Sequence, residues 1–162
     1  MEKLRIHRND ILEIEVNDKG ETIIFDVADV ELPLKFERSY NEVRRIQSEL
    51  KGKLIVLEKQ KDIKNKGSLY SKNEKAAFEM YAKAFKDMRR AMDGFLGEGA
   101  CEKIFGKTNY LEMYDDLINE LSKPDDSGKS IIDKLHLTQE DMFTRIKNKY
   151  GARNESVLKV EK

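Results

Sequence analysis

The sequence has little of what most catalytic and metal sites require. Cys101 is the only cysteine among 162 residues, and the two histidines, His7 and His136, stand far apart in the chain. One thiol can form neither an internal disulfide nor a cysteine cluster for zinc, and neither histidine belongs to a metal-ligand spacing. These shortages predict a protein without a bound metal, a cofactor or a catalytic site, so we do not expect an enzyme.

Long apolar runs and an excess of one charge are also missing. No stretch approaches the roughly 20 apolar residues of a membrane span, and the charged N-terminus has no apolar core of signal-peptide length. Basic and acidic side chains number 31 each, so the formal net charge is zero. A nucleic-acid-binding domain would carry a basic excess. The sequence therefore predicts a soluble, cytoplasmic protein that binds neither membranes nor nucleic acids.

What the chain does have is abundant charge combined with periodic apolar residues. Charged side chains make up 38% of the sequence and hydrophobic ones 39%. Because the apolar residues recur at helical spacing, this composition favours long helices with charged outer faces and a narrow apolar stripe. The length suits one domain with a core of its own.

A β-hairpin is predicted near the N-terminus. Residues 11–16 and 22–27 are rich in β-branched side chains, and they flank the turn sequence Asn-Asp-Lys-Gly at 17–20. The segment from Asp10 to Glu31 is acidic. An isolated hairpin is marginally stable in water, so we expect this one to pack on helices or to pair with another chain.

Two long amphipathic helices follow. Pro33 suits the first turn of a helix that is predicted to run to about Lys64. Ser71, with Glu74 three residues later, has the pattern of a capping box and should start a second helix that ends near Leu96. The first apolar stripe comprises Phe36, Tyr40, Val43, Leu50, Leu54 and Leu57, with Gln47 as a polar interruption, and the second comprises Phe78, Tyr81, Phe85, Met88, Met92 and Phe95. The short loop between them predicts an antiparallel helical hairpin.

A cluster of glycines marks a corner after the second helix. Gly94, Gly97, Gly99 and Gly106 surround the short piece 100–105, which predicts one or two helical turns between glycine-assisted bends. A phosphate-binding loop is disfavoured, because the Gly-Lys-Ser/Thr ending is missing and the glycines follow a helix. We interpret these four glycines as structural.

Shorter helices are predicted toward the C-terminus. One should run from about Asn109 to Lys123, the sequence at 124–128 should break it, and Thr138 should cap a final helix that ends near Tyr150. The predicted fold class is therefore mainly α (α+β), with an N-terminal β-hairpin, a long antiparallel helical hairpin and shorter C-terminal helices. Residues 1–123 form the predicted core domain, and residues 124–162 a helical extension and tail.

Binding to other protein chains is the function that this pattern favours. The two stripes offer more apolar surface than one helical hairpin can bury, so we expect part of it to contact a partner or a second copy. The first helix is the preferred site, because its stripe is interrupted at Gln47 and lysines follow from Lys51 to Lys66. The predicted contact residues are Tyr40, Val43, Leu50, Leu54 and Leu57.

One segment resembles a known family. Residues 93–109 read Asp-Gly-Phe-Leu-Gly-Glu-Gly-Ala-Cys-Glu-Lys-Ile-Phe-Gly-Lys-Thr-Asn. This is similar to a signature of small proteins encoded in the tail-gene clusters of long-tailed phages and prophages of Gram-positive bacteria, which look like tail assembly chaperones. Leu96 stands where the family usually has phenylalanine. The order of hairpin, long helices, glycine corner and third helix is similar as well.

The resemblance implies a non-enzymatic protein of the bacterial host cytoplasm. Such a chaperone would cover the helical tape-measure protein until subunits of the tail tube polymerise around it, so its partners would be the tape-measure protein and the tail tube protein. A homo-oligomer is compatible with this role. Two alternatives stay open: a structural component that is retained in a phage tail or tail-like particle, and a regulatory helical module that binds another protein.

Overall fold

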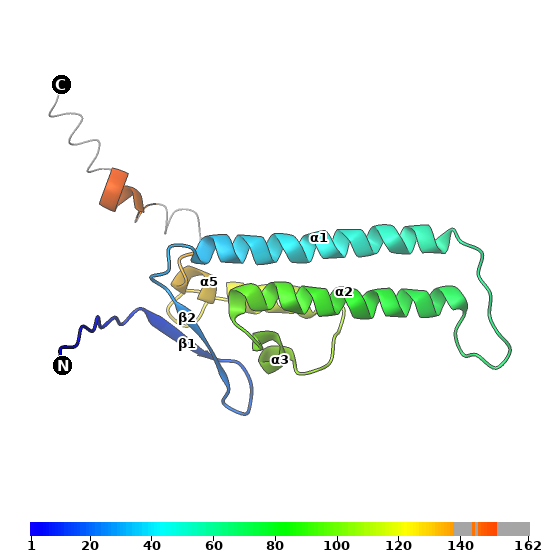
Figure 1. The fold of residues 1–162 in the computed structure, drawn as a ribbon, viewed down its shortest axis with the longest axis horizontal. Coiled ribbons are helices and arrows are strands. Elements are labelled where there is room, and N and C mark those ends of the chain that lie inside the picture. Colours follow the sequence, from blue (N-terminus) through cyan, green and yellow to red (C-terminus); the bar gives the residue numbers. More distant parts are fainter. Residues whose placement is uncertain (138–143, 145, 152–162) are drawn as a thin grey trace, which may run out of the picture.

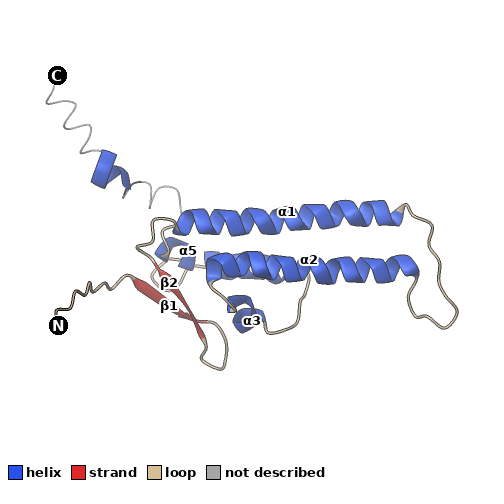
Figure 2. Ribbon diagram, in the orientation of Figure 1, coloured by secondary structure: helices blue, strands red, loops and turns tan. Residues whose placement is uncertain are grey.

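Two long helices lie side by side, and the short elements gather at one end of them (Figure 1). The computed structural model describes residues 1–137, 144 and 146–151. The elements, coloured by type in Figure 2, are β1 (Ile11–Glu15), β2 (Thr22–Asp26), α1 (Leu32–Glu58), α2 (Lys72–Leu96), α3 (Ala100–Phe105), α4 (Met113–Ser122), α5 (Ile131–Lys134) and a π-helical turn (Lys147–Gly151). This arrangement confirms the predicted fold class.

The β-hairpin forms where the sequence predicts it. β1 and β2 are antiparallel, with Leu12 opposite Phe25 and Ile14 opposite Ile23. Because side chains alternate along a strand, these four point to one face, where Ile23 and Phe25 are buried. The Phe25 ring lies 5.2 Å from the ring of Phe95 at the end of α2. The hairpin is therefore stabilised by packing on the helices, as expected.

The start of α2 also follows the prediction. The Ser71 hydroxyl accepts a hydrogen bond from the Glu74 backbone N–H, and the Glu74 carboxylate accepts one from the Ser71 N–H. These two bonds satisfy N–H groups that have no partner inside the helix. The capping box predicted from the sequence is confirmed.

The end of α1 differs from the prediction. The helix stops at Glu58 and does not continue to Lys64. The Asn73 side chain at the start of α2 donates hydrogen bonds to the carbonyls of Leu57 and Gln60, at 3.3 and 3.0 Å. These carbonyls lie at the end of the helix, where backbone C=O groups have no hydrogen-bond donor within the helix. A long-range contact thus terminates α1 one and a half turns early.

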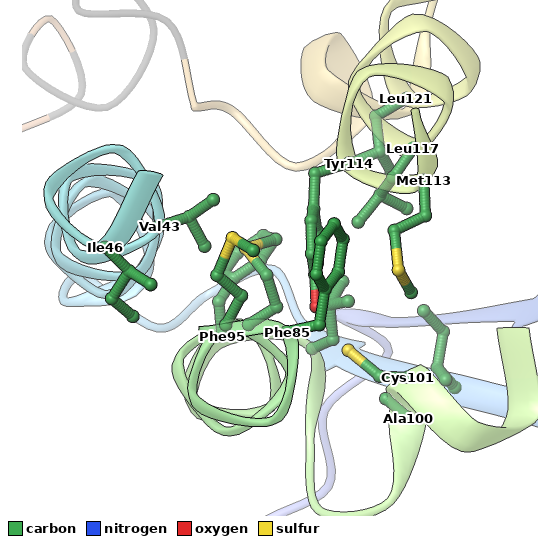
Figure 3. Close-up of a cluster of buried hydrophobic side chains, with 14 of the residues drawn as sticks. Val43, Ile46, Phe85, Phe95, Ala100, Cys101, Met113, Tyr114, Leu117 and Leu121 are labelled. Atoms are coloured by element: carbon green, nitrogen blue, oxygen red, sulfur yellow. The ribbon is translucent and has the colours of Figure 1, made fainter. Parts of the chain in front are cut away.

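The two apolar stripes face each other and form the core (Figure 3). On α1 the inward position falls on Ile46, while the predicted stripe residue Gln47 is exposed. On α2 the stripe is buried from Phe85 to Phe95, but Phe78 is 52% exposed. The correction at Phe78 has a simple cause: this part of α2 lies beyond the elements that cover the rest of the helix (Figures 1 and 2).

The shorter helices cover one end of the helical hairpin. Met113 is fully buried and Tyr114 nearly so, and both pack into the core beside Phe85 (Figure 3). α4 begins at Met113 and not at the predicted Asn109, because the side-chain oxygen Oδ1 of Asn109 accepts a hydrogen bond from Arg89 Nε at 2.6 Å. An asparagine whose oxygen is used in this way is not available as an N-cap.

The predicted C-terminal extension packs on this body in its first part. Leu135 is fully buried in the same core, and Ile131 and Ile132 pack against it. The predicted final helix, from Thr138 to Tyr150, lies largely outside the described residues. Within it, residues 144 and 146 are helical and the π-helical turn Lys147–Gly151 follows.

Candidate functional site

The predicted contact residues lie mostly inside the molecule. Val43, Leu50 and Leu57 are only 5%, 9% and 8% exposed, because their stripe packs against α2. Tyr40 and Leu54 are half-buried. The Tyr40 ring stacks on Phe36, and the Arg44 guanidinium lies over it. The heptad spacing that suggested a partner surface thus serves mainly the contact between α1 and α2, and a partner cannot reach the three buried side chains in this fold.

A different surface is open on the same helices. Beyond about Leu50, α1 and the first half of α2 extend past the other elements; we call residues 50–84 the arm (Figures 1 and 2). A groove runs between the two helices of the arm. Its lining, which we call the arm groove, comprises Glu49, Gly52, Lys53, Val56, Leu57 and Gln60, with Ala76 and Met80 on α2. A second hollow shares Glu49, Lys53 and Met80 and continues the groove toward Asp87.

Small residues create the arm groove. Gly52 has no side chain, and a Cβ built there would meet nothing within 4 Å. Ala76 supplies only a methyl group on the opposite helix. Between them, Val56 is 58% exposed and Met80 is half-buried, so the groove has an apolar wall that water reaches. A hollow of this shape, with apolar side chains on its walls, suits the ridge of a third helix.

Charged side chains line the arm groove and the hollow that continues it. Glu49 and Lys53, both on α1, line the groove, and Lys83 on α2 lines the second hollow. Arg45, near its inner end, binds Glu42 and Glu49 at 2.5 and 2.7 Å. The hydrogen bond from Arg45 lowers the pKa of Glu42, and the two carboxylates raise the pKa of Arg45. Arg45 thus offsets most of the negative charge at the inner end, and Lys53 is the lysine that lines the groove.

The loop that closes the arm is tied to both helices. Asp62 accepts hydrogen bonds from the backbone N–H groups of Ile63 and Asn73, at 2.9 and 3.0 Å. Hydrogen bonds from Ser71 and from the Asn73 backbone lower the pKa of the Asp62 carboxyl. Asp62, which follows α1, thus caps the start of α2, and Asn73, at the start of α2, caps the end of α1.

The glycine corner connects α2 to α3 and positions the β-hairpin. Gly97, Gly99 and Gly106 all have positive φ, at 111°, 73° and 71°. The corner also joins the strands, since Asn17 Nδ2 donates to the Lys103 carbonyl and Lys103 Nζ to the Thr22 carbonyl, at 3.0 and 3.1 Å. The segment that resembles the tail chaperones therefore builds the junction between helices and hairpin.

Cys101 is a structural residue of this corner. The thiol is 1% exposed, and the backbone N–H of Cys101 donates to Asp93 Oδ1 at 2.9 Å. Burial, and then the neighbouring Asp93, raise the pKa of the thiol far above its usual range. A protonated, inaccessible thiol is a poor nucleophile.

Gly99→Ala is expected to lower the free energy of unfolding by about 1 kcal/mol, because an L-residue pays to adopt a left-handed conformation. Gly94→Ala is the matched control. Gly94 lies inside α2, and a Cβ there would stand 3.6 Å from Ser39 Oγ, an ordinary contact. Urea denaturation should therefore show Gly94→Ala equal to or more stable than the parent chain. Equal stability of all three proteins would contradict the structural role of Gly99.

Metal-binding clusters and membrane-spanning helices are both absent from the residues that the structure describes. Among residues 1–137, 144 and 146–151, no group of three or more histidine, cysteine or acidic side chains is placed to hold a metal ion. No helix within these residues combines the length and the apolar character needed to cross a bilayer. His7 is exposed, and His136 follows α5 with a positive φ of 56°.

Comparison with known proteins adds no relative. No family model, curated protein or solved structure matches the chain. A functional interpretation therefore depends on the arm and on the resemblance of residues 93–109.

The sequence contains a signal for the arm groove that apolar spacing does not reveal. Gly52 is an isolated glycine within a long helical pattern. An isolated glycine within a helix costs stability, so it often has a packing or functional reason. The second signal is the pair Ala76 and Ala77 near the start of α2. Two small positions on facing helices mark a place where a third element can approach closely.

Proposed function

We propose that this chain is a non-enzymatic tail assembly chaperone of a phage or prophage, which binds the tape-measure protein in the bacterial cytoplasm. The observation that carries the proposal is the arm groove: an apolar hollow between two helices that none of the described elements covers. A tape-measure protein is a long helix with an apolar stripe, and such a helix aggregates unless the stripe is covered. The groove offers a third-helix position for it.

The shape of the molecule supports a reversible interaction. The arm contributes few large side chains to the groove, chiefly Val56 and Met80, with Leu57 buried at its base. Affinity of such a surface depends on a few anchors, and a small apolar area gives moderate binding. Tail tube subunits would have to displace the chaperone as they polymerise, and moderate binding permits this.

The resemblance is the second, independent support. It covers residues 93–109, which lie in the body at the glycine corner and outside the arm groove. In this proposal the corner holds the hairpin and α2 in place, and the arm binds the client. The arm groove and the resemblance therefore concern different parts of the chain, and evidence against one would not remove the other.

The test is co-expression of the chain with the tape-measure protein of the same gene cluster. We expect the tape-measure protein to be more soluble with the chain than without it, and to co-purify with it. If neither effect is seen, the chaperone proposal fails. Recovery of the chain from purified particles would instead favour the structural component.

Val56→Gln and Ile55→Gln form a matched pair for the same experiment. Both residues are exposed β-branched aliphatics on α1, but only Val56 lines the arm groove. Loss of one central apolar anchor typically costs at least 1 kcal/mol, so Val56→Gln should weaken binding about tenfold. Ile55→Gln should leave binding within about twofold of the parent chain. Isothermal titration with a soluble tape-measure fragment measures both, and equal effects would exclude the arm groove as the site.

A further inference from the structure

The two ends of the molecule carry opposite charge. Between Lys59 and Lys75 there are six lysines and two carboxylates, while between Asp10 and Glu31 there are eight carboxylates and one lysine. The first segment is the loop end of the arm, and the second is the β-hairpin with its connection to α1 (Figure 1). The zero net charge of the chain conceals this separation.

The excess charge at each end is available to a partner. At the loop end, both carboxylates are engaged, Asp62 in capping α2 and Glu74 in the capping box. At the hairpin, Asp26 and Asp29 pair with Arg8 and Lys35. The remaining hairpin carboxylates form no salt bridge with any described residue, and neither do the six lysines; these carboxylates include Glu13, Glu15, Asp18 and Glu21.

Neighbouring segments neutralise the hairpin only in part. Residues 1–9 carry three basic side chains and one carboxylate, and Lys103 Nζ donates to the Thr22 carbonyl, so an acidic excess remains. Residues 120–134, which lie beside β1, carry four carboxylates and three lysines. The opposite end of the molecule is too far away, since the 27 residues of α1 span about 40 Å at 1.5 Å per residue. That distance is several times the Debye length of about 8 Å at physiological salt, so the two ends do not compensate each other within one chain.

Each charged end also exposes apolar side chains. On the outer face of the hairpin, Ile24 is 59% exposed and lies directly opposite Glu13, and Ile11 is 52% exposed. At the loop end, Leu69 is 84% exposed, and the exposed rings of Tyr70 and Phe78 meet edge to face at 5.1 Å. The two surfaces match in character, apolar side chains among carboxylates on one and among lysines on the other.

We propose that a second copy of this chain is the partner of both surfaces, in an antiparallel dimer with the loop end of each copy on the β-hairpin of the other. A two-fold axis across the long direction makes both contacts at once and closes the assembly. One chain supplies both members of the complementary pair, which favours a copy of itself over an unrelated acidic protein. The arm groove is not needed for this contact, so the dimer is independent of the proposed chaperone function.

Charge reversal tests the dimer through sedimentation of the purified full-length chain. The hairpin variant is Glu13→Lys/Glu15→Lys, and the loop variant is Lys61→Glu/Lys64→Glu. We expect the parent chain to dimerise at low salt and to dissociate as salt rises, and each variant alone to dimerise at least tenfold more weakly. An equimolar mixture of the two variants should restore the dimer, because both contacts then pair opposite charges.

The mixture distinguishes a broken interface from a damaged fold. Circular dichroism must show that each variant is folded, and Glu98→Lys/Glu112→Lys, two exposed glutamates outside both surfaces, changes the net charge as the hairpin variant does. This control should dimerise like the parent chain. A parent chain that stays monomeric at every concentration overturns the proposal, and so does a mixture of folded variants that fails to dimerise. If the chain stays monomeric and sediments only with anionic vesicles, the lysines of the loop end bind lipid, and the dimer proposal is overturned as well.

Discussion

Phe85→Ala is expected to lower the free energy of unfolding by about 3–5 kcal/mol, the usual cost of removing a buried aromatic ring. Phe85 is 7% exposed and lies where α2 meets α4. Its ring centroid lies 6.5 Å from that of Tyr81 and 6.3 Å from that of Tyr114, and Figure 3 shows Tyr114 beside it. The loss includes the transfer energy of the ring and the cavity left among neighbours that cannot close over it.

Phe78→Ala is the control for this measurement. It removes the same ring from the same helix, but Phe78 is 52% exposed and its ring contacts the half-exposed ring of Tyr70. Its cost should stay below about 1 kcal/mol, as for most exposed positions. Urea melts followed by circular dichroism give both values. A loss below about 1 kcal/mol for Phe85→Ala would mean that α4 does not cover this side of α2.

Raising the pH from about 8 to about 10 is expected to lower the free energy of unfolding by about 2 kcal/mol, chiefly through Cys101. Burial raises the pKa of the Cys101 thiol in the folded state. The unfolded thiol ionises near ~8.5. Above that pH the unfolded chain loses a proton that the folded chain keeps, so ionisation stabilises the unfolded state. The contribution is fully present below the unfolded pKa and is lost as the pH rises toward the folded one.

The Tyr114 hydroxyl acts in the same direction at higher pH. Burial, and then the neighbouring Cys101, raise its pKa, and its oxygen has no hydrogen-bond partner among the described atoms. Its unfolded pKa near ~10 makes its share small over this range. Cys101→Ala should therefore keep most of its stability between about pH 8 and about pH 10, with a loss below about 1 kcal/mol. Equal losses in the two proteins would show that the thiol is not responsible.

Local signals in the sequence predicted the fold well. The β-branched runs gave the hairpin, and the Ser71 and Glu74 pair gave the start of α2, because each signal acts between neighbours in the chain. The predicted end of α1 and the predicted start of α4 were wrong, because Asn73 caps α1 from another helix and Arg89 donates a hydrogen bond to the Asn109 side chain. Neither partner is visible from local spacing.

The binding surface was harder to predict for a related reason. Heptad spacing identifies which side chains turn inward, but it does not say whether the covering surface is the same chain or another one. Val43, Leu50 and Leu57 fit the pattern of a partner surface and are covered by α2. The open groove depends on Gly52 and Ala76, residues that contribute by the volume they leave empty. The spacing of apolar residues identifies large buried side chains, and it does not identify a hollow that small residues leave open.

The continuity of α1 and α2 has a mechanical consequence. Both helices pass from the body into the arm without a break, and the loop is closed by caps that each helix receives from the other side. The arm is therefore stiff, and its loop end can move relative to the body only if both helices bend. Gly52 is its most compliant point, since glycine weakens the surrounding helix. A force applied to the loop is therefore transmitted through α1 and α2 to their other ends, where the β-hairpin and the glycine corner lie.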